Sequence, residues 1–133
     1  MKKIEHIGIA VKDIEKAGVL FKLLLGTESY KSEEVSGEAV KVLFFKTGET
    51  KIELLQALNE SSPIARFIEK KGEGIHHLAF EVDDIRKAME HLKANGFQLL
   101  SDEPKAGADN KLICFLHPKS TNSVLIEICQ EIR

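Results

Sequence analysis

The stretch "GIHHLAFEVDDIRKA", residues 74–88, repeats in altered form a stretch near the start of the chain, "EHIGIAVKDIEKA", residues 5–17. When the two histidines are aligned, at an offset of 71 residues, six of the twelve positions from the histidine onward are identical. The identical pairs are His6/His77, Val11/Val82, Asp13/Asp84, Ile14/Ile85, Lys16/Lys87 and Ala17/Ala88. Self-similarity of this kind indicates a duplicated supersecondary unit.

A second match lies near the end of each half of the chain. The segment "KIELLQ", residues 51–56, resembles "LIEICQ", residues 125–130, and this match aligns Glu53 with Glu127 and Gln56 with Gln130. The two repeats therefore cover about residues 1–72 and 73–133. Because a repeated unit of this size does not bury its apolar face alone, we expect one domain over residues 1–133, made of both repeats.

Each repeat reads as a strand, a helix and three further strands, which gives βαβββ twice and an α+β fold class. Aspartates at positions 13 and 84 are expected to cap helices over 13–25 and 84–94, and Gly26 and Asn95–Gly96 to end them. A short linker helix is expected between Ser62 and Gly72. The expected strands are 4–11, 29–35, 39–46 and 50–57 in the first repeat, and 75–82, 97–101, 111–117 and 123–130 in the second.

Strand alternation predicts where four matched polar residues point: His6 and Glu53 in the first repeat, and His77 and Glu127 in the second. Side chains on a strand alternate between two faces, so each of these residues lies opposite the branched apolar residues of its own strand. The apolar faces are expected to pack on the helices, and the polar faces to line a cleft. Two similar units packed about a pseudo-twofold axis would bring equivalent positions together. This predicts a site for one divalent metal ion, in which nitrogen and oxygen ligands favour zinc, cobalt, nickel, manganese or iron(II). The four predicted ligands are His6, Glu53, His77 and Glu127.

Composition excludes several other classes of protein. Hydrophobic residues make up 43% of the chain, which is enough for a core, and the net charge of −2 is spread without a basic block, so nucleic acid is not an expected partner. No apolar run is long enough to span a bilayer, and no membrane partner is expected. Cys114 and Cys129 lie in apolar runs and are expected to be buried, reduced thiols in a cytoplasmic protein. The leucine-rich "LFKLLLG", residues 20–26, is interpreted as a core face rather than a membrane or partner helix.

The repeated segments and the four matched polar residues resemble those of the vicinal oxygen chelate superfamily, which contains glyoxalases, bleomycin resistance proteins and dioxygenases. Within it the sequence is most similar to methylmalonyl-CoA epimerases, and next to glyoxalase I (lactoylglutathione lyase). The resemblance covers essentially the whole chain. The segments that carry it are "HIGIAVKDIEKA", "SPIARFI" followed by "GIHHLAFEVDDI", and "FLHPKSTNSVLIEI".

The resemblance implies two βαβββ modules that form one curved mixed sheet around a cleft, with a metal held by the four residues named above. It implies an isomerase that moves the α-proton of a methylmalonyl-CoA-type thioester through a metal-stabilised enolate. Glu127 is favoured as one proton-transfer base, and Glu53 is the symmetric candidate for the other. Some bacterial epimerases carry a second acid on the strand that matches residues 39–45, where this chain has none; Glu38 just precedes it.

The substrate and the partners stay open at this stage. A glyoxalase I-type lyase acting on a glutathione conjugate would use the same site, and a third reading is a small-molecule-binding or resistance protein of the same fold. Coenzyme A requires cations near the cleft, and Lys119 and Lys111 are the candidates on loops of the second repeat. The resemblance also implies a homodimer. His76 is interpreted as structural because it points away from His77, and Cys129 as a core residue.

Overall fold

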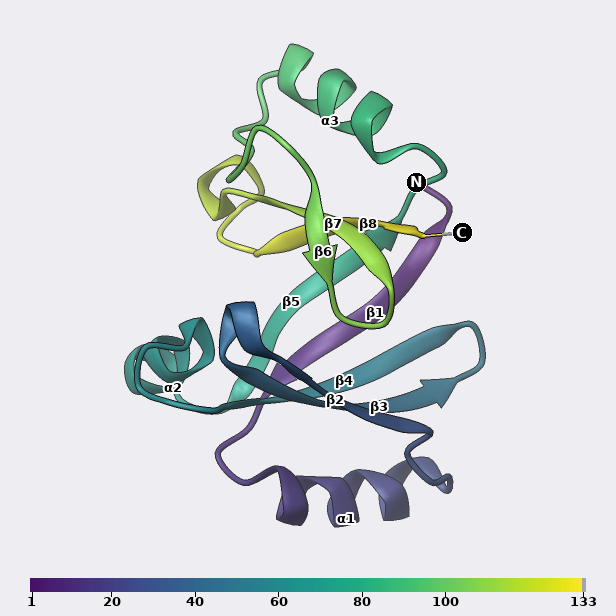
Figure 1. Ribbon diagram of the computed structural model, residues 1–133, viewed down its shortest axis with the longest axis vertical. Coiled ribbons are helices and arrows are strands. Elements are labelled where there is room, and N and C mark those ends of the chain that lie inside the picture. Colours follow the sequence, from purple (N-terminus) through teal and green to yellow (C-terminus); the bar gives the residue numbers. More distant parts are fainter. Residues whose placement is uncertain (133) are drawn as a thin grey trace. The chain divides into compact units, whose positions relative to one another are not determined.

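The structure, a computed structural model, describes residues 1–132 and contains two compact units, shown in Figure 1. One unit covers residues 6–76, and the other combines residues 1–5 with the residues from 77 onward. Among the described residues, no helix is long and apolar enough to cross a membrane.

The first module follows the predicted order. Strand β1 (Lys3–Ala10) leads to helix α1 (Ile14–Leu25), and strands β2 (Lys31–Val35), β3 (Val40–Thr47) and β4 (Thr50–Ala57) follow. A single 3-10 turn, η1 (Ser36–Glu38), precedes β3. Strand β4 is parallel to its neighbour β1 and antiparallel to its other neighbour, β3. Strand β2 pairs with the far side of β3, also antiparallel.

The second module has the same order and the same mixture of pairings. Strand β5 (Gly74–Glu81) leads to helix α3 (Ile85–Ala94), which is followed by β6 (Lys105–Gly107), β7 (Lys111–Leu116), the 3-10 turn η2 (Pro118–Ser120) and β8 (Ile126–Glu131). Strand β8 pairs with β5 in parallel and with β7 in antiparallel, and β6 pairs with β7. The predicted α+β class and the two βαβββ modules are therefore confirmed.

The start of the main helix is built in the same way in both modules. The Asp13 carboxylate accepts hydrogen bonds from the backbone N–H groups of the first turn of α1, and Asp84 does so for α3. The side-chain oxygen of Gln56 accepts the Ile14 N–H at 2.7 Å, and that of Gln130 accepts the Ile85 N–H at 2.8 Å. The paired aspartates and glutamines of the repeat thus satisfy the orphan donors of each helix start and tie that helix to the last strand of its module.

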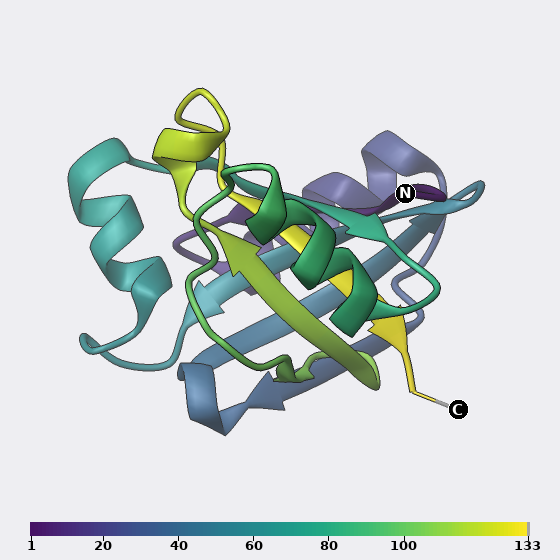
Figure 2. The ribbon, with the colours of Figure 1, turned by 90° about the horizontal axis from the view of Figure 1, so that it is seen from above.

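Each helix covers one face of its own sheet, as the alternation predicted. Helix α1 packs through Ile14, Ala17, Phe21 and Leu25 on apolar residues of β1, β3 and β4. Helix α3 packs through Ile85, Met89 and Leu92 on apolar residues of β7 and β8, and Figure 2 shows this green helix running along β7. The opposite face of each sheet is left for the matched polar residues.

The predicted linker helix is present as α2 (Pro63–Lys71). Ser62 caps it by accepting the Ile64 N–H, and Gly72, with a φ of 77°, ends it. The positive φ explains the glycine, because other residues adopt this conformation only at a cost.

The predicted strand at 97–101 is wrong. In this segment a single bridge joins Leu99 to Leu116, and the edge strand is β6 instead. The apolar side chains that suggested a strand, Phe97 and Leu99, pack against the α3 core. At Gly107, a Cβ atom would lie 2.8 Å from the Ile113 side chain, so the true edge strand approaches β7 too closely for a larger residue there.

The interpretation of "LFKLLLG" as a core face is also wrong for most of its leucines. Phe21 and Leu25 pack in the α1 core, whereas Leu20, Leu23 and Leu24 are exposed together with Val19. The helix therefore has an apolar inner side and a largely apolar outer side.

Candidate metal and proton-transfer site

The first module holds a buried histidine–glutamate pair. The Nδ1 atom of His6 lies 3.1 Å from Oε2 of Glu53, and both side chains are almost fully buried. The parallel register of β1 and β4 sets Gly8 beside Glu53, so His6 and Glu53 share the face that α1 does not cover. Gly8 has no side chain, which leaves room beside the carboxylate.

The second module holds the equivalent pair. The Nε2 atom of His77 lies 3.4 Å from Oε1 of Glu127, and both residues are again buried. Here Ala79 on β5 is in register with Glu127 on β8, as Gly8 is with Glu53 in the first module. The duplicated sequence therefore produces the same local arrangement twice: a histidine in the middle of one strand, a small residue two positions after it, and a glutamate beside that small residue on the parallel neighbouring strand.

An aromatic residue stands directly opposite each glutamate. Phe44 on β3 faces Glu53, and Phe115 on β7 faces Glu127. The ring of Phe115 meets the His77 ring edge to face, with centroids 5.6 Å apart. Residues opposite one another in antiparallel strands have side chains on the same side, so each phenylalanine shields its pair from water. The sequence analysis did not predict a role for these two phenylalanines. They lie 71 residues apart, which is the offset that relates the two repeats and could have identified them.

The donor atoms of both pairs fit a divalent transition metal ion. Imidazole nitrogen and carboxylate oxygen are the ligand types that zinc, cobalt, nickel and manganese accept, whereas calcium and magnesium favour oxygen alone. A buried imidazole–carboxylate pair can also bind a proton in place of a metal ion. The donor atoms of each module thus suit a divalent transition metal ion.

Strand β3 supplies no further acid beside Glu53. The residues of β3 that share the face of Glu53 are Val40, Val42 and Phe44, which are apolar and buried, and Lys46, which is exposed near the end of the strand. Lys41 lies on the other face and pairs with Glu15 of α1, with 3.9 Å between Nζ and Oε1. The face of β3 that is shared with Glu53 therefore carries no acid.

One acid on that face was missed by the sequence reasoning. Glu33 on β2 is in register with Val42, which places it on the same side of the sheet as Glu53, and it pairs with Lys31 at 3.1 Å. Alternation along β2, combined with the antiparallel register, is the signal that would have identified it. Its partial exposure and its lysine partner distinguish it from the buried Glu53.

The two lysines suggested for coenzyme A lie in different environments. Lys119 is exposed in η2, next to His117, whose Nδ1 accepts the Lys119 N–H. Lys111 is not on a loop, contrary to the expectation: it lies in β7, is 3% exposed, and its Nζ is within 4 Å of three carboxylates. These carboxylates belong to Glu5, Asp109 and Glu131. Lys111 is thus a buried ion-pair partner, and Lys119 is the accessible cation.

His76 and Cys129 have the packing roles that were expected. The His76 ring stacks edge to face on Phe67 of α2, with centroids 5.0 Å apart, and burial next to the Lys71 charge lowers the pKa of His76 to about 4. Cys129 is buried with Ala79 and Ile113, and burial raises the pKa of its thiol well above the ordinary value. Cys114 is likewise buried and free, so both cysteines are buried thiols as predicted.

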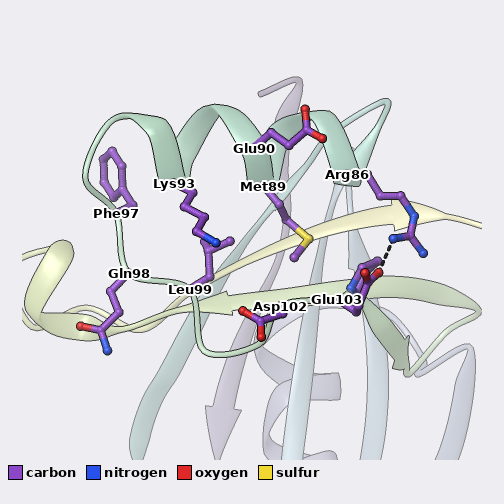
Figure 3. Close-up of a pocket in the computed structure, with 10 residues that line it drawn as sticks. Arg86, Met89, Glu90, Lys93, Phe97, Gln98, Leu99, Asp102 and Glu103 are labelled. Atoms are coloured by element: carbon purple, nitrogen blue, oxygen red, sulfur yellow. Dashed lines mark hydrogen bonds and ion pairs between the residues drawn. The ribbon is translucent and has the colours of Figure 1, made fainter.

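A separate pocket of about 380 Å³ lies between α3 and the segment that follows it, and contains none of the predicted site residues. Figure 3 shows Met89 and Lys93 directed from α3 toward Leu99, and the ion pair between Arg86 and Glu103 at one side. The pocket is lined by both apolar and charged side chains. The charged ones among its lining residues are exposed, so they do not indicate a particular ligand.

The fold and the paired His–Glu arrangement define a member of a known family. Residues 5–115 match the model of the Glyoxalase/Bleomycin resistance protein/Dioxygenase superfamily, and the chain belongs to this superfamily. The resemblance noted from the sequence motifs is thereby confirmed.

Within the superfamily the chain is similar to epimerases of acyl-CoA thioesters. It is 44% identical to the ethylmalonyl-CoA/methylmalonyl-CoA epimerase of Cereibacter sphaeroides, over 96% of this chain and 97% of that protein. The methylmalonyl-CoA epimerase of Mycobacterium tuberculosis superposes with a TM-score of 0.94 at 31% identity, covering 98% of this chain and 88% of that one. A Streptomyces coelicolor methylmalonyl-CoA epimerase variant in complex with 2-nitronate-propionyl-CoA superposes with a TM-score of 0.92 at 29% identity, covering 98% and 95%.

Proposed function

We propose that this protein is a metal-dependent epimerase that moves the α-proton of a methylmalonyl-CoA-type thioester. The observation that carries the proposal is the buried histidine–glutamate pair that each module presents in the same register. The similarity to acyl-CoA epimerases over nearly the whole chain supports the substrate class.

The proposed metal ligands are His6, Glu53, His77 and Glu127, which would together hold one divalent ion per chain. Cobalt, manganese, zinc and nickel all suit this donor set. When bound, such an ion supplies positive charge that lowers the cost of the negative charge developing next to the thioester carbonyl. The burial of all four side chains supports this role, because electrostatic stabilisation is stronger where water is excluded.

Epimerisation requires that a proton leave one face of the α-carbon and that another arrive on the opposite face. We assign Glu127 as one proton-transfer group and Glu53 as the other, one from each module. The Glu53 face of β3 supports the second assignment, because it carries no alternative acid. Phe44 and Phe115 would exclude water, so that each proton passes through a side chain.

We assign Lys119, which is exposed in η2, to the phosphates of coenzyme A. Lys111 is better suited to holding Glu5, given its burial among carboxylates. We further propose that the protein functions as a cytoplasmic homodimer. The family resemblance implies the dimer, and the two free, buried thiols are compatible with a reducing compartment.

A glyoxalase I-type lyase is the second candidate. One residue favours it: the fourth ligand position carries the carboxylate of Glu53 where some epimerases have glutamine. The same proton-transfer groups would then act on the hemithioacetal of methylglyoxal and glutathione. A metal-free protein that only binds a small molecule is the third candidate, and the intact set of four donor residues argues against it.

Proton NMR in deuterium oxide distinguishes the candidates. Protein loaded with cobalt or manganese is offered methylmalonyl-CoA and, separately, the methylglyoxal–glutathione hemithioacetal. Rapid exchange of the α-proton together with racemisation of the coenzyme A ester is the expected result. Formation of lactoylglutathione with no exchange on the ester would instead make the protein a glyoxalase. Binding of a ligand without turnover of either substrate would support the third candidate.

A further inference from the structure

Lys31, the first residue of strand β2, lies on the same face of the sheet as Glu53. The register of the first module places Lys31 beside Phe44 and Phe44 beside Glu53. Residues directly opposite one another in antiparallel strands point to the same side, so the three side chains form one row across β2, β3 and β4 (Figure 1). The metal and proton-transfer roles proposed above do not use the cation that ends this row.

The Lys31 side chain lies over the ring of Phe44, on the side of the row that leads to Glu53. Its Nζ atom is 5.4 Å from the ring centroid, within the range of a favourable cation–π contact. The same Nζ is 3.1 Å from Oε1 of Glu33, two residues further along the same face of β2. The Lys31 side chain is 36% exposed, so its ammonium group is held in place and still open to a ligand. A group that is already oriented loses less conformational entropy when it binds.

The second module provides an internal comparison for this cation. Phe115 is the counterpart of Phe44, and the bridge between Leu99 and Leu116 sets Leu100 opposite Phe115. The Leu100 N–H donates to the Phe115 carbonyl oxygen at 2.9 Å, and the Leu100 side chain is 52% exposed. The row that contains Glu127 therefore ends in an apolar side chain, whereas the row that contains Glu53 ends in a positive charge.

A lysine at the edge of a sheet also has a simpler role, because it hinders pairing with the strand of another chain. That role requires only an exposed charge. It requires neither an aromatic ring under the ammonium group nor a glutamate that holds it on one face of the sheet. The orientation of Lys31 toward Phe44 therefore indicates a function on the face that carries Glu53.

We propose that Lys31 binds the free carboxylate of the substrate and thereby selects thioesters that carry a second acid group on the α-carbon. This inference rests on the epimerase proposed above, in which Glu53 moves a proton at that carbon. Strands lie about 4.8 Å apart, so the Cα atoms of Lys31 and Glu53 are separated by about 10 Å across β3. An α-carbon that faces Glu53 and a carboxylate one bond away from it fit this span, with the carboxylate directed toward Lys31.

The chemistry of the two groups supports this assignment. A lysine ammonium group carries three N–H donors, so it can bind a substrate carboxylate and Glu33 together. Removal of the α-proton creates negative charge next to a carboxylate that is already negative, and a cation held there in advance offsets the repulsion. The phosphates of coenzyme A fit Lys31 less well, because they lie at the far end of the substrate from the α-carbon.

The test compares two thioesters that differ only in the carboxylate, methylmalonyl-CoA and propionyl-CoA. Calorimetry on the cobalt-loaded natural protein should show tighter binding of methylmalonyl-CoA. Lys31→Met should weaken methylmalonyl-CoA binding about 10–100-fold, as expected for a hydrogen bond between charged groups, and change propionyl-CoA binding less than about twofold. Lys31→Arg should keep the preference. Lys46→Met, the matched control, removes an exposed cation on the same face of β3 and should change neither affinity.

Each outcome supports the inference or overturns it. Equal losses for both thioesters in Lys31→Met would assign Lys31 to the phosphates or to packing, and an unchanged affinity for methylmalonyl-CoA would remove it from the site. Lys31→Gln, which keeps the length and polarity of the side chain, replaces Lys31→Met if that variant does not fold. A natural protein that binds neither thioester would overturn the proposed function as well. Exchange of the α-proton of methylmalonyl-CoA by the natural protein, with no selective loss in the variant, would overturn only the role of Lys31.

Discussion

The two modules agree on the side of the sheet that carries the polar residues and differ on the side covered by the helix. In both, an aspartate and a glutamine hold the start of the helix, and a buried histidine lies beside a glutamate on the parallel neighbouring strand. On the outer surface, α1 is apolar where α3 is polar. The comparison suggests that function constrains the polar face in both modules, whereas the outer face of each helix is free to acquire a separate role.

The largest expected effect concerns the two glutamates. Glu127→Gln and Glu53→Gln should each lower the epimerisation rate by about 10²–10⁴-fold, because each removes a proton-transfer group. If the modules serve opposite faces of the α-carbon, each variant should still exchange the α-proton of one epimer, and the two variants should favour opposite epimers. NMR in deuterium oxide with resolved epimers measures this, with metal content determined alongside as a control. Loss of the same epimer in both variants would contradict the division of roles.

A difference between the modules should appear at Lys111. Replacing it with methionine leaves Glu5 buried without its cation, and breaking such a pair should lower the free energy of unfolding by about 3 kcal/mol. Urea denaturation measures this loss. The double variant Lys111→Met/Glu5→Gln should recover part of the stability, since it removes the uncompensated charge as well. An unchanged midpoint for Lys111→Met would show that the buried cluster contributes little.

The glutamine ties allow a direct comparison of the modules. Gln56→Ala and Gln130→Ala should each lower the free energy of unfolding by about 1–2 kcal/mol, because a backbone N–H at a helix start loses its partner. The near-identical distances predict nearly equal losses, which chemical denaturation can resolve. A loss in one variant alone would mean that the matched hydrogen bonds differ in energetic weight despite their similar geometry.

The smallest expected effect lies at Lys119. Its replacement by alanine should raise KM for the coenzyme A thioester by roughly 3–10-fold with kcat nearly unchanged, as expected for an exposed contact to phosphate. Lys105→Ala in the edge strand β6 serves as the control, and its KM should not change. A fall in kcat instead of a rise in KM would show that Lys119 acts in the chemical step.

Local patterns account for most of what the sequence predicted. Aspartate caps, strand alternation and the repeated histidine are read within a few residues, and the structure confirms the helices, the module order and the local pairing in each module. The four-ligand metal site stays a prediction. Long-range contacts account for the errors. The most deeply buried of the three carboxylates around Lys111 belongs to Glu5, more than a hundred residues away in the sequence, so the local pattern did not predict the burial of Lys111.

The other two errors have a common physical origin. An apolar segment is expected to be buried, but its sequence does not show which other element it packs against. Phe97 and Leu99 are buried by packing against α3 and do not form a strand. The edge strand of the second module is β6 instead. Within residues 1–132, Leu20, Leu23 and Leu24 stay exposed, because Phe21 and Leu25 already occupy the core beneath α1, which the sequence alone could not show.

We propose that each module supplies half of one metal site. The most direct test is the stoichiometry of cobalt or manganese binding, measured by calorimetry on the natural protein and on His6→Ala and His77→Ala, one histidine from each module. We predict one ion per chain, with affinity lowered by a similar, large factor in both variants. Two ions per chain, or binding that survives in either variant with unchanged affinity, would contradict the claim and assign the metal to the modules separately.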